Sequence, residues 1–275
     1  MPTKIRLRDI HKSFGPKQVL NGIDLDVETG ESLVVIGGSG TGKSVLLKHI
    51  IGLLQPDRGT VEVDGVDLST LNHREIVGFR RRYGMAFQEG ALFDSMDVRG
   101  NIAFPLKRQT DRPDEEINER VDRCLRLVNL EGVGEKLPSE LSGGMRRRVG
   151  FARAIALEPD IVLFDEPTTG LDPVTTAQID EVILNLLDRL DSTAITITHD
   201  MTSAFRVADR IAMLHGGKII ALAPPEEFKQ LDDRRVQQFI HGETDGPLIQ
   251  DRASRRRAGS ADAEAGPPHE EMEQV

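Results

Sequence analysis

The feature that most constrains this chain is a glycine-rich octapeptide between a short apolar run and a helical stretch. Residues 37–44 read GGSGTGKS and match the pattern G-x-x-x-x-G-K-[ST]. The preceding run SLVVI at 32–36 has the length and composition of a buried strand, and a helix is predicted from Lys43 to about Ile51. A strand, a glycine loop and a helix N-terminus in this order direct backbone N–H groups towards an anion. The sequence therefore predicts a phosphate-binding loop rather than a flexible surface turn.

Further apolar runs predict that this loop belongs to an α/β sheet. Residues 161–164 and 194–197 each end in polar residues and precede helical stretches, as buried parallel strands do. Residues 1–28 alternate apolar and polar positions around a turn at 14–16, which is typical of two antiparallel strands with one wet face. We expect an α/β fold with a P-loop core and an antiparallel β-subdomain.

Helical periodicity and composition suggest the domain organisation. A helical subdomain is expected over about 97–158, and it contains one apolar helical face made by Ile117, Val121, Cys124, Leu125 and Val128. A hairpin turning at residues 216–217 and helical stretches to about Ile240 complete a domain expected to span 1–245. Residues 246–275 contain little that can pack and are expected to be largely disordered.

Composition excludes several classes of protein. The 45 acidic residues outnumber the 35 Lys and Arg, and the formal net charge of -10 provides no overall basic field for nucleic acid. The only cysteine, Cys124, lies among apolar residues and is interpreted as a packing thiol, which excludes a disulfide framework. No apolar run reaches the ~20 residues of a membrane span, and the N-terminus lacks an apolar signal core. We expect a cytosolic protein that touches membranes only through partners.

Two adjacent acids point to hydrolysis of the bound phosphate compound. Asp165 and Glu166 follow a buried strand, and ligands of α/β sheets lie at that end of the strands. Asp165 is expected to hold Mg²⁺ through water and Glu166 to polarise the water that attacks the γ phosphate. Lys43 would supply charge to the β and γ phosphates, and the hydroxyl of Ser44 would coordinate Mg²⁺. Two acids in a solvated turn are the alternative interpretation.

The stretch LSGGMRRRVGFARA at 141–154 provides a second anion-binding helix end. Ser142 is a good N-cap, and two glycines leave the first N–H groups of the helix open. Together with the P-loop and LFDEPTTGLDP, this stretch resembles the nucleotide-binding subunit of ABC transporters over about residues 5–240. The resemblance implies an ATPase that uses ATP and Mg²⁺, works as a head-to-tail homodimer and drives transport through an integral membrane permease.

The resemblance also implies roles for individual residues. Those expected to contact ATP are Phe14, which would stack on adenine, and Gly37, Gly38, Ser39, Gly40, Thr41, Gly42, Lys43, Ser44, Val45 and Gln88. Those expected to cover the ATP of the other copy are Ser142, Gly143, Gly144 and Asp172. Glu166, His199 and Lys43 are the expected catalytic residues, and Ser44, Gln88 and Asp165 the expected magnesium ligands. Two positions depart from the family pattern, Met145 where glutamine is usual and Val45 where threonine is common. Neither removes a phosphate-contacting group.

A narrower resemblance concerns the transported substrate. FQEGALFDSMDVRGNIAFPL, the LSGGM signature and QFIHGETDGP are similar to the ATPases of bacterial Mla systems, which transport phospholipid. This implies a peripheral protein on the cytoplasmic face of the inner membrane, with a permease, an MCE lipid-binding protein and a STAS-domain accessory protein as partners. The segment 236–247 is hypothesised to reach the other ATPase or an accessory subunit.

The same region contains an apolar cluster whose role the sequence leaves open. Leu92, Phe93, Met96 and Phe104 follow Gln88 closely and either receive a docked helix of the permease or pack in the core.

Two rival classes are weighed against a transporter ATPase, and the first of them, a soluble ABC-type ATPase, shares its nucleotide chemistry. A soluble ABC-type ATPase of DNA repair would carry long coiled coils or zinc-binding cysteines, and one of translation would carry two ATPase domains. A P-loop kinase or GTPase would carry an acceptor lid or an N-K-x-D motif. None of these features is present in the sequence, whereas an ABC transporter for another cargo remains an alternative.

Overall fold

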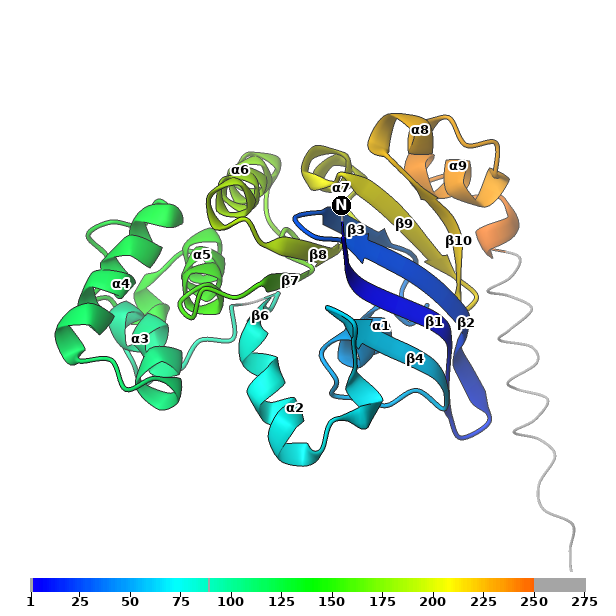
Figure 1. Ribbon diagram of the computed structural model, residues 1–275. Coiled ribbons are helices and arrows are strands. Elements are labelled where there is room, and N and C mark those ends of the chain that lie inside the picture. The colour runs from blue at the N-terminus through cyan, green and yellow to red at the C-terminus, as the bar shows by residue number, and fades with distance from the viewer. Residues whose placement is uncertain (1, 89, 250–275) are drawn as a thin grey trace, which may run out of the picture. The chain divides into compact units, whose positions relative to one another are not determined.

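The computed structural model describes residues 2–88 and 90–249, and the chain divides into two compact units, Met1–Phe228 and Lys229–Val275. The first unit is built on two sheets (Figure 1). Its strands are β1 (Thr3–Phe14), β2 (Lys17–Glu28), β3 (Ser32–Ile36), β4 (Arg58–Val63), β5 (Val66–Asp67), β6 (Tyr83–Ala86), β7 (Ile161–Asp165), β8 (Thr193–Ile197), β9 (Arg210–His215) and β10 (Lys218–Ala223). Its α-helices are α1 (Lys43–Ile50), α2 (His73–Phe79), α3 (Val98–Gln109), α4 (Asp114–Leu127), α5 (Gly143–Ala154), α6 (Pro173–Leu190) and α7 (Met201–Val207).

Short 3₁₀ turns and two further helices complete the described chain. The turns are η1 (Leu68–Thr70), η2 (Arg80–Arg82) and η3 (Pro138–Glu140). Helix α8 (Pro225–Lys229) ends one residue past the first unit, and α9 (Arg234–His241) belongs to the second. Most of the extension proposed at 246–275 lies outside the described residues.

The antiparallel β-subdomain is a four-stranded sheet in the order β2-β1-β4-β5. Strands β1 and β2 pair as a hairpin in which Phe14 lies opposite Lys17, so the turn falls where the sequence predicts it. Gly15 in this turn has φ +57°, a left-handed conformation that a residue with a side chain adopts only at a cost in free energy.

The six-stranded sheet has the order β10-β9-β3-β8-β7-β6. Strands β9, β3, β8, β7 and β6 pair in parallel, and β10 returns antiparallel along β9. The apolar runs predicted as strands are β3, β7 and β8, and all five residues of β3 and of β8 are buried. Strands covered on both faces read as continuous apolar runs, which confirms the prediction of an α/β core.

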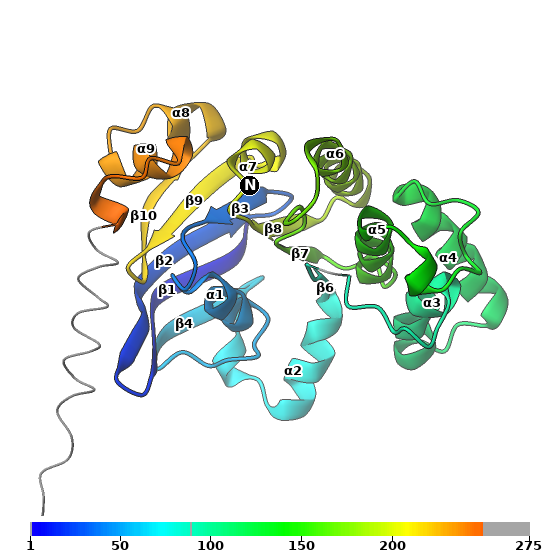
Figure 2. The same cartoon turned by 180° about the vertical axis from the view of Figure 1, so that it is seen from behind.

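The P-loop helix α1 lies between the two sheets (Figure 2). Its side chains Leu46, Leu47 and Ile50 are 2% exposed or less and share one apolar cluster with both sheets. Burial of each such side chain contributes about 2 kcal/mol, so α1 is held firmly below the glycine loop.

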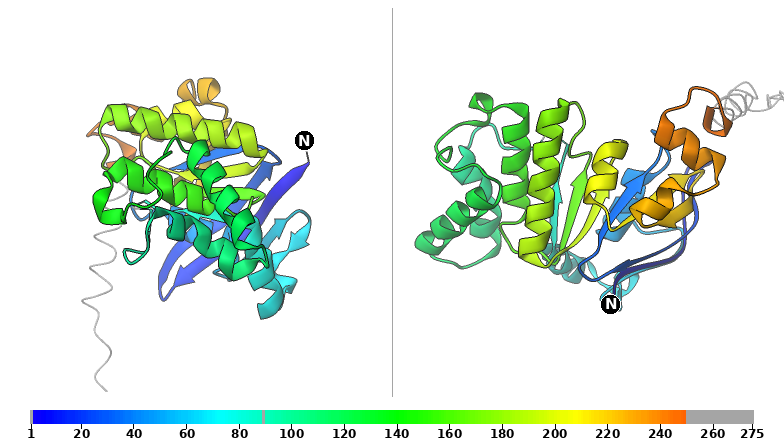
Figure 3. Two further views of the ribbon diagram at one scale, coloured as in Figure 1. Left: turned by 90° about the vertical axis from the view of Figure 1, so that its left-hand side faces the viewer. Right: turned by 90° about the horizontal axis from the view of Figure 1, so that it is seen from above.

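Helices α3, α4 and α5 gather beyond the β6 edge of the parallel sheet (Figure 1). The predicted apolar face of α4 is confirmed, since Val121 and Cys124 are fully buried. Phe151 of α5 meets Phe164 of β7 edge to face, with 5.1 Å between ring centroids, and this contact joins the helices to the sheet. Helices α5 and α6 lie side by side (Figure 3).

Among the described residues, no helix has the length and apolar character to cross a membrane.

The buried thiol provides a test of this packing. Burial raises the pKa of Cys124 to about 11, so that at pH 8 only on the order of one thiol in a thousand is ionised. We expect iodoacetamide at pH 8 to leave native protein unlabelled and to label it fully in 6 M guanidinium, as followed by intact-mass spectrometry. Cys124→Ala provides the blank in both conditions. Rapid labelling of native protein would contradict the packing of α4.

Candidate nucleotide site

Four neighbouring strands end at one edge of the six-stranded sheet, and a predicted functional segment follows each of them. The glycine loop follows β3 and His199 follows β8, while β7 ends at Asp165 and Gln88 follows β6. Because the order is β3-β8-β7-β6 and all pairs are parallel, these segments leave the sheet side by side. Carboxyl ends of parallel strands are where α/β folds bind ligands. The fold therefore brings together groups that are up to 162 residues apart in the chain, from Gly37 to His199.

Close packing explains the glycines of the loop at two positions. Gly37 has φ +150°, and a Cβ there would lie 2.3 Å from the carbonyl oxygen of Leu214. Gly42 has φ +109° and is the N-cap of α1, and a Cβ there would lie 2.9 Å from the Cδ2 atom of Leu20. A glycine N-cap has no side chain to occupy the first N–H groups of the helix. These groups are therefore available to a phosphate, as the sequence predicts.

Lys43 lies over the loop that precedes it. Its ammonium donates hydrogen bonds to the carbonyl oxygens of Gly37, at 2.7 Å, and Gly38, at 3.1 Å. Burial lowers the pKa of Lys43, and the nearby charges of Glu166 and Asp165 oppose that effect. The structure thus places the predicted cation close to both predicted acids.

Asp165 is the last residue of β7 and pairs with Ile197 of β8. Burial raises the pKa of Asp165, and the charge of Glu166 raises it further, whereas Lys43 and Lys48 lower it. Two carboxylates in sequence at a half-buried strand end create a negative potential that a cation relieves. The hydroxyl oxygen of Ser44 and this carboxylate are the hard oxygen ligands that Mg²⁺ prefers, so the residues present fit this ion.

Glu166 is held in a turn with φ +51°, a conformation that is uncommon for a side chain of this size. Its N–H donates to the carbonyl oxygen of Ile197 at 2.8 Å. Its Oε2 atom accepts a hydrogen bond from Oγ1 of Thr169 at 2.9 Å and lies 2.8 Å from Nδ1 of His199. Strained backbone that is secured on several sides is typical of functional sites. The contact with His199 was not anticipated from the sequence.

The exposure of the two partners differs. The side chain of Glu166 is 18% exposed and that of His199 is 58% exposed. Asp200, the next residue, caps α7 by accepting from the N–H groups of Thr202 and Ser203. This cap fixes the turn that contains His199. The imidazole is therefore accessible from solvent at the sheet edge, while the carboxylate of Glu166 is mostly buried.

The segment Ser142–Gly144 begins helix α5, as the sequence predicts. The Oγ of Ser142 accepts from the N–H of Met145 at 3.3 Å. A Cβ on Gly144 would lie 2.7 Å from Cγ2 of Thr175, whereas Gly143 has only Leu171 nearby, at 3.8 Å. Within residues 2–88 and 90–249, no hydrogen bond or ion pair joins 142–144 to the glycine loop. The role in covering the ATP of another copy stays a prediction.

Two other predicted contacts lie at the surface. Asp172 caps α6 by accepting from the N–H groups of Val174 and Thr175. The hydroxyl of Thr175 also donates to its carboxylate at 2.5 Å, and this bond, followed by the backbone bonds, lowers the pKa of Asp172. Phe14 is 49% exposed at the hairpin end, with the ammonium of Lys12 5.8 Å from its ring centroid. An exposed ring on a rigid hairpin is suited to stacking on a base, but its contact with adenine also stays a prediction.

The opposite end of the P-loop helix is anchored by residues that the sequence analysis missed. Arg80 donates to the carbonyl oxygens of Ile51, at 3.2 Å, and Gly52, at 2.6 Å. The hydroxyl of Tyr83 donates to the carbonyl oxygen of Ile50 at 2.8 Å. A cation at a helix C-terminus also interacts favourably with the helix dipole. Arg80 precedes β6 and Tyr83 begins it, so the end of α1 is joined directly to the strand that leads to Gln88. The arginine run at 80–82 was the available signal.

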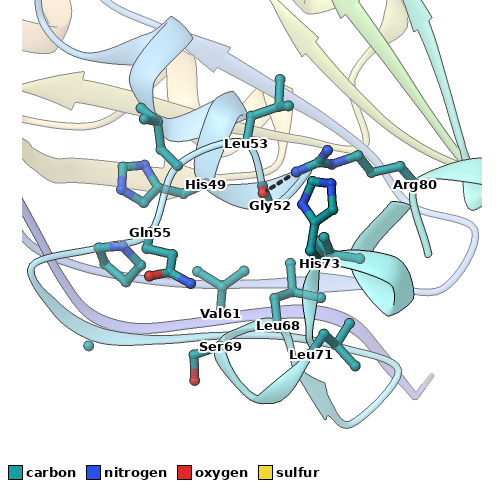
Figure 4. Close-up of a pocket in the computed structure, with 14 residues that line it drawn as sticks. His49, Gly52, Leu53, Gln55, Val61, Leu68, Ser69, Leu71, His73 and Arg80 are labelled. Atoms are coloured by element: carbon teal, nitrogen blue, oxygen red, sulfur yellow. Dashed lines mark hydrogen bonds between the residues drawn. The ribbon is translucent and has the colours of Figure 1, made fainter. Parts of the chain in front are cut away.

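A cavity of about 330 Å³ lies beside this anchor (Figure 4). Leu53, Leu68, Leu71 and Ile76 supply apolar lining, and Arg80 reaches Gly52 at its edge. No sequence pattern identifies this cavity, because its walls come from α1, α2, β4 and η1.

The apolar cluster after Gln88 lies partly at the surface. Phe93 is 41% exposed, and its ring centroid is 4.7 Å from that of Phe104. Met96 and Phe104 also line a hollow of about 670 Å³ on α3. The rings therefore pack on each other at a surface rather than in the main core.

The fold and the site together define an ATPase built on a P-loop, and comparison with known proteins identifies its family. The protein-family model described as "ABC transporter" matches residues 20–169, more than half of the chain. The chain belongs to the ABC transporter family, and it is an ATP-hydrolysing subunit of that family.

Three similar proteins illustrate the relationship. The "Probable ribonucleotide transport ATP-binding protein mkl" of Mycobacterium leprae is 41% identical over 248 residues, which cover 90% of this chain and 72% of that protein. The "Intermembrane phospholipid transport system ATP-binding protein MlaF" of Haemophilus influenzae is 40% identical over 244 residues, which cover 89% and 92%. The solved dimer of the ATP-binding cassette MJ0796 with ADP and Pi has a TM-score of 0.73 at 30% identity and covers 80% of this chain and 98% of its own.

The steric constraint at Gly37 can be tested by urea unfolding. Gly37→Ala would place a methyl group 2.3 Å from a backbone oxygen, and we expect it to lower the free energy of unfolding by about 2 kcal/mol or more. Gly30→Ala is the matched control, since Gly30 has φ +77° and nothing within 4 Å of its Cβ position. Backbone strain alone should cost about 1 kcal/mol there. Equal losses in the two variants would show that the contact with Leu214 is unimportant.

Proposed function

We propose that two copies of this chain bind two ATP molecules head to tail and that hydrolysis drives lipid transport through a partner permease. The arrangement that carries the proposal is the convergence of Lys43, Asp165, Glu166 and His199 at one sheet edge. The lipid assignment is supported by 40% identity over 92% of a relative named for phospholipid transport.

The glycine loop and Lys43 account for binding of the phosphates in this proposal. The open N–H groups at the start of α1 and the ammonium of Lys43 supply a positive potential where the β and γ phosphates would lie. Ser44, Gln88 and Asp165 would hold Mg²⁺, with Asp165 acting through water. The ion, when bound, neutralises charge that develops on the phosphates.

Glu166 and His199 account for hydrolysis. Glu166 has a carboxylate fixed through Oε2 by Thr169, which suits it to orient and polarise an attacking water. The exposed imidazole of His199 would contact the γ phosphate and so report its presence to Glu166, to which it is hydrogen bonded. Loss of the γ phosphate would change the partners of both side chains.

The second copy would complete the site. Ser142, Gly143 and Gly144 present the open N-terminus of α5 to the ATP of the partner copy, and Asp172 would lie at the seam. A single chain leaves Ser142 and Asp172 exposed, and the dimer of a 30% identical cassette supports this stoichiometry.

The partners follow from the lipid assignment. The permease would place a helix near Phe93 and the hollow lined by Met96 and Phe104. These residues follow β6 and Gln88 closely in the sequence. An MCE lipid-binding protein and a STAS-domain protein would complete the assembly at the cytoplasmic face of a bacterial inner membrane. The segment 236–247 would contact the other ATPase or the accessory subunit.

Turnover by a Glu166→Gln variant tests the catalytic assignment. The amide keeps the shape of the side chain and removes its charge, so we expect kcat to fall at least about a hundredfold while ATP still binds. ATP-dependent dimers should persist on size-exclusion chromatography. Glu181→Gln, on an exposed position of α6, is the control and should hydrolyse ATP at the unaltered rate. Near-normal turnover by Glu166→Gln would remove Glu166 from the mechanism.

Co-purification tests the transported substrate. Tagged chain is recovered from gently solubilised membranes of its host, and the accompanying proteins and lipids are identified by mass spectrometry. We expect a permease, an MCE protein and phospholipid. A permease with another cargo, such as the ribonucleotide in the name of the mycobacterial relative, would keep the motor and replace the substrate. Recovery with ribosomes or DNA would contradict the transporter assignment.

A further inference from the structure

Helix α5 contains a buried arginine that the nucleotide site does not use directly. Arg147 is 7% exposed. Its Nε donates to the carbonyl oxygen of Gln88 at 2.6 Å, and its Nη2 donates to the carbonyl oxygen of Thr169. Burying a guanidinium costs free energy unless hydrogen bonds replace its water, and a planar fork can bond two separate carbonyls at once. Arg147 therefore acts as a bridge between two segments.

Both segments bound by Arg147 flank the candidate catalytic groups. Gln88 follows β6 and Thr169 lies in the turn after β7, and these two strands pair in parallel with Ala86 opposite Phe164. The guanidinium holds the two exits from the sheet at a fixed separation.

The same face of α5 holds the segment after Gln88 at two more points. Arg153 donates to the carbonyl oxygens of Gly90 and Ala91, both at 2.9 Å. A Cβ on Gly150 would lie only 2.8 Å from Cα of Gly90, so the helix presses directly on that backbone. Residues 147, 150 and 153 recur every three positions and so lie along one side of the helix. Any movement of α5 must therefore carry this segment with it.

Thr169 connects this bridge to Glu166. Its Oγ1 donates to Oε2 of Glu166 at 2.9 Å, and Oε2 is also the oxygen that faces His199. The hydroxyl of Thr169 thus orients the carboxylate of Glu166, and Arg147 holds the backbone carbonyl of the same threonine. A continuous set of contacts runs from α5 to Glu166.

We propose that Arg147 and Thr169 are positioning residues that set the orientation of the Glu166 carboxylate according to the position of α5. The proposal rests on the catalytic role proposed above for Glu166. Because α5 begins at the segment 142–144, which is proposed to contact the ATP of the partner copy, engagement of that ATP would adjust Gln88 and Glu166 together. The orientation of the Glu166 carboxylate would then follow the position of α5 through hydrogen bonds within one chain.

The hydroxyl of Thr169 is tested first, with a variant of nearly the same volume. Thr169→Val removes the hydrogen bond to Oε2, and we expect kcat to fall about tenfold, as loss of one bond to a charged group implies. The KM for ATP and the affinity for a fluorescent ATP analogue should stay within about twofold. Thr169→Ser restores a hydroxyl and should recover most of the rate. Unaltered kcat in Thr169→Val, or no recovery in Thr169→Ser, would overturn the positioning role of Thr169.

A double-mutant cycle tests whether Arg147 acts through Thr169. Lysine keeps the charge but lacks the fork, so Arg147→Lys should lower kcat, and the double variant should lose little more than the worse single variant. Multiplication of the two losses would overturn the connection. Arg148→Lys is the control, because Arg148 lies on the same helix and donates to Asn129, away from both segments. If Arg147→Lys does not fold, Arg147→Gln replaces it in the cycle. The variants Thr169→Val and Thr169→Ser still decide the role of Thr169.

Glu166→Gln separates this inference from the proposed function. An active Glu166→Gln would defeat the assignment of Glu166 itself. An inactive Glu166→Gln together with a fully active Thr169→Val would leave that assignment intact and defeat only the positioning residues.

Discussion

The alignment of four parallel strand ends is the constraint on which the rest of the structure depends. Hydrogen bonding between β3, β8, β7 and β6 fixes where each strand stops. A shift of one residue in β7 would turn Asp165 to the other face of the sheet and move Glu166 away from the carbonyl of Ile197. The buried faces of these strands resist such a shift, because every apolar side chain would change its environment. Core packing thus holds the geometry of the candidate site.

Electrostatics at this edge depends on the same packing. Burial lowers the pKa of Lys43 and raises that of Asp165, and each lies close enough to moderate the shift of the other. Charges with low solvent exposure interact strongly with ions of the opposite sign. A polyphosphate would supply the negative charge that faces Lys43, and its cation the positive charge that faces Asp165. The charges of the candidate site therefore suit the metal-bound anion that we propose as its ligand.

Helix α5 combines two structural features at different parts of its length. Its first turn leaves the N–H groups of Gly143 and Gly144 open to an anion, while the hydroxyl of Ser142 accepts from the N–H of Met145. Its middle binds backbone carbonyls in the segments that follow β6 and β7, through Arg147 and Arg153. A rigid helix that binds a ligand at one end and backbone along its side can convert a contact into a displacement.

The sequence by itself determined the main local elements and the candidate residues that they carry. The boundaries of β3 and the start of α1 were predictable because the run SLVVI and the glycine loop have strong local signals, and Ser142 was recognisable as a cap for the same reason. Only the tertiary structure decided which distant groups meet. The contact of Glu166 with His199, the hydroxyl of Thr169 and the bridge made by Arg147 depend on strand order and register. The anchor of Arg80 on α1 also escaped prediction, since a run of arginines reads equally as a solvated surface. Hydrogen bonds between distant segments leave no periodic pattern in a chain, whereas local propensities and caps do.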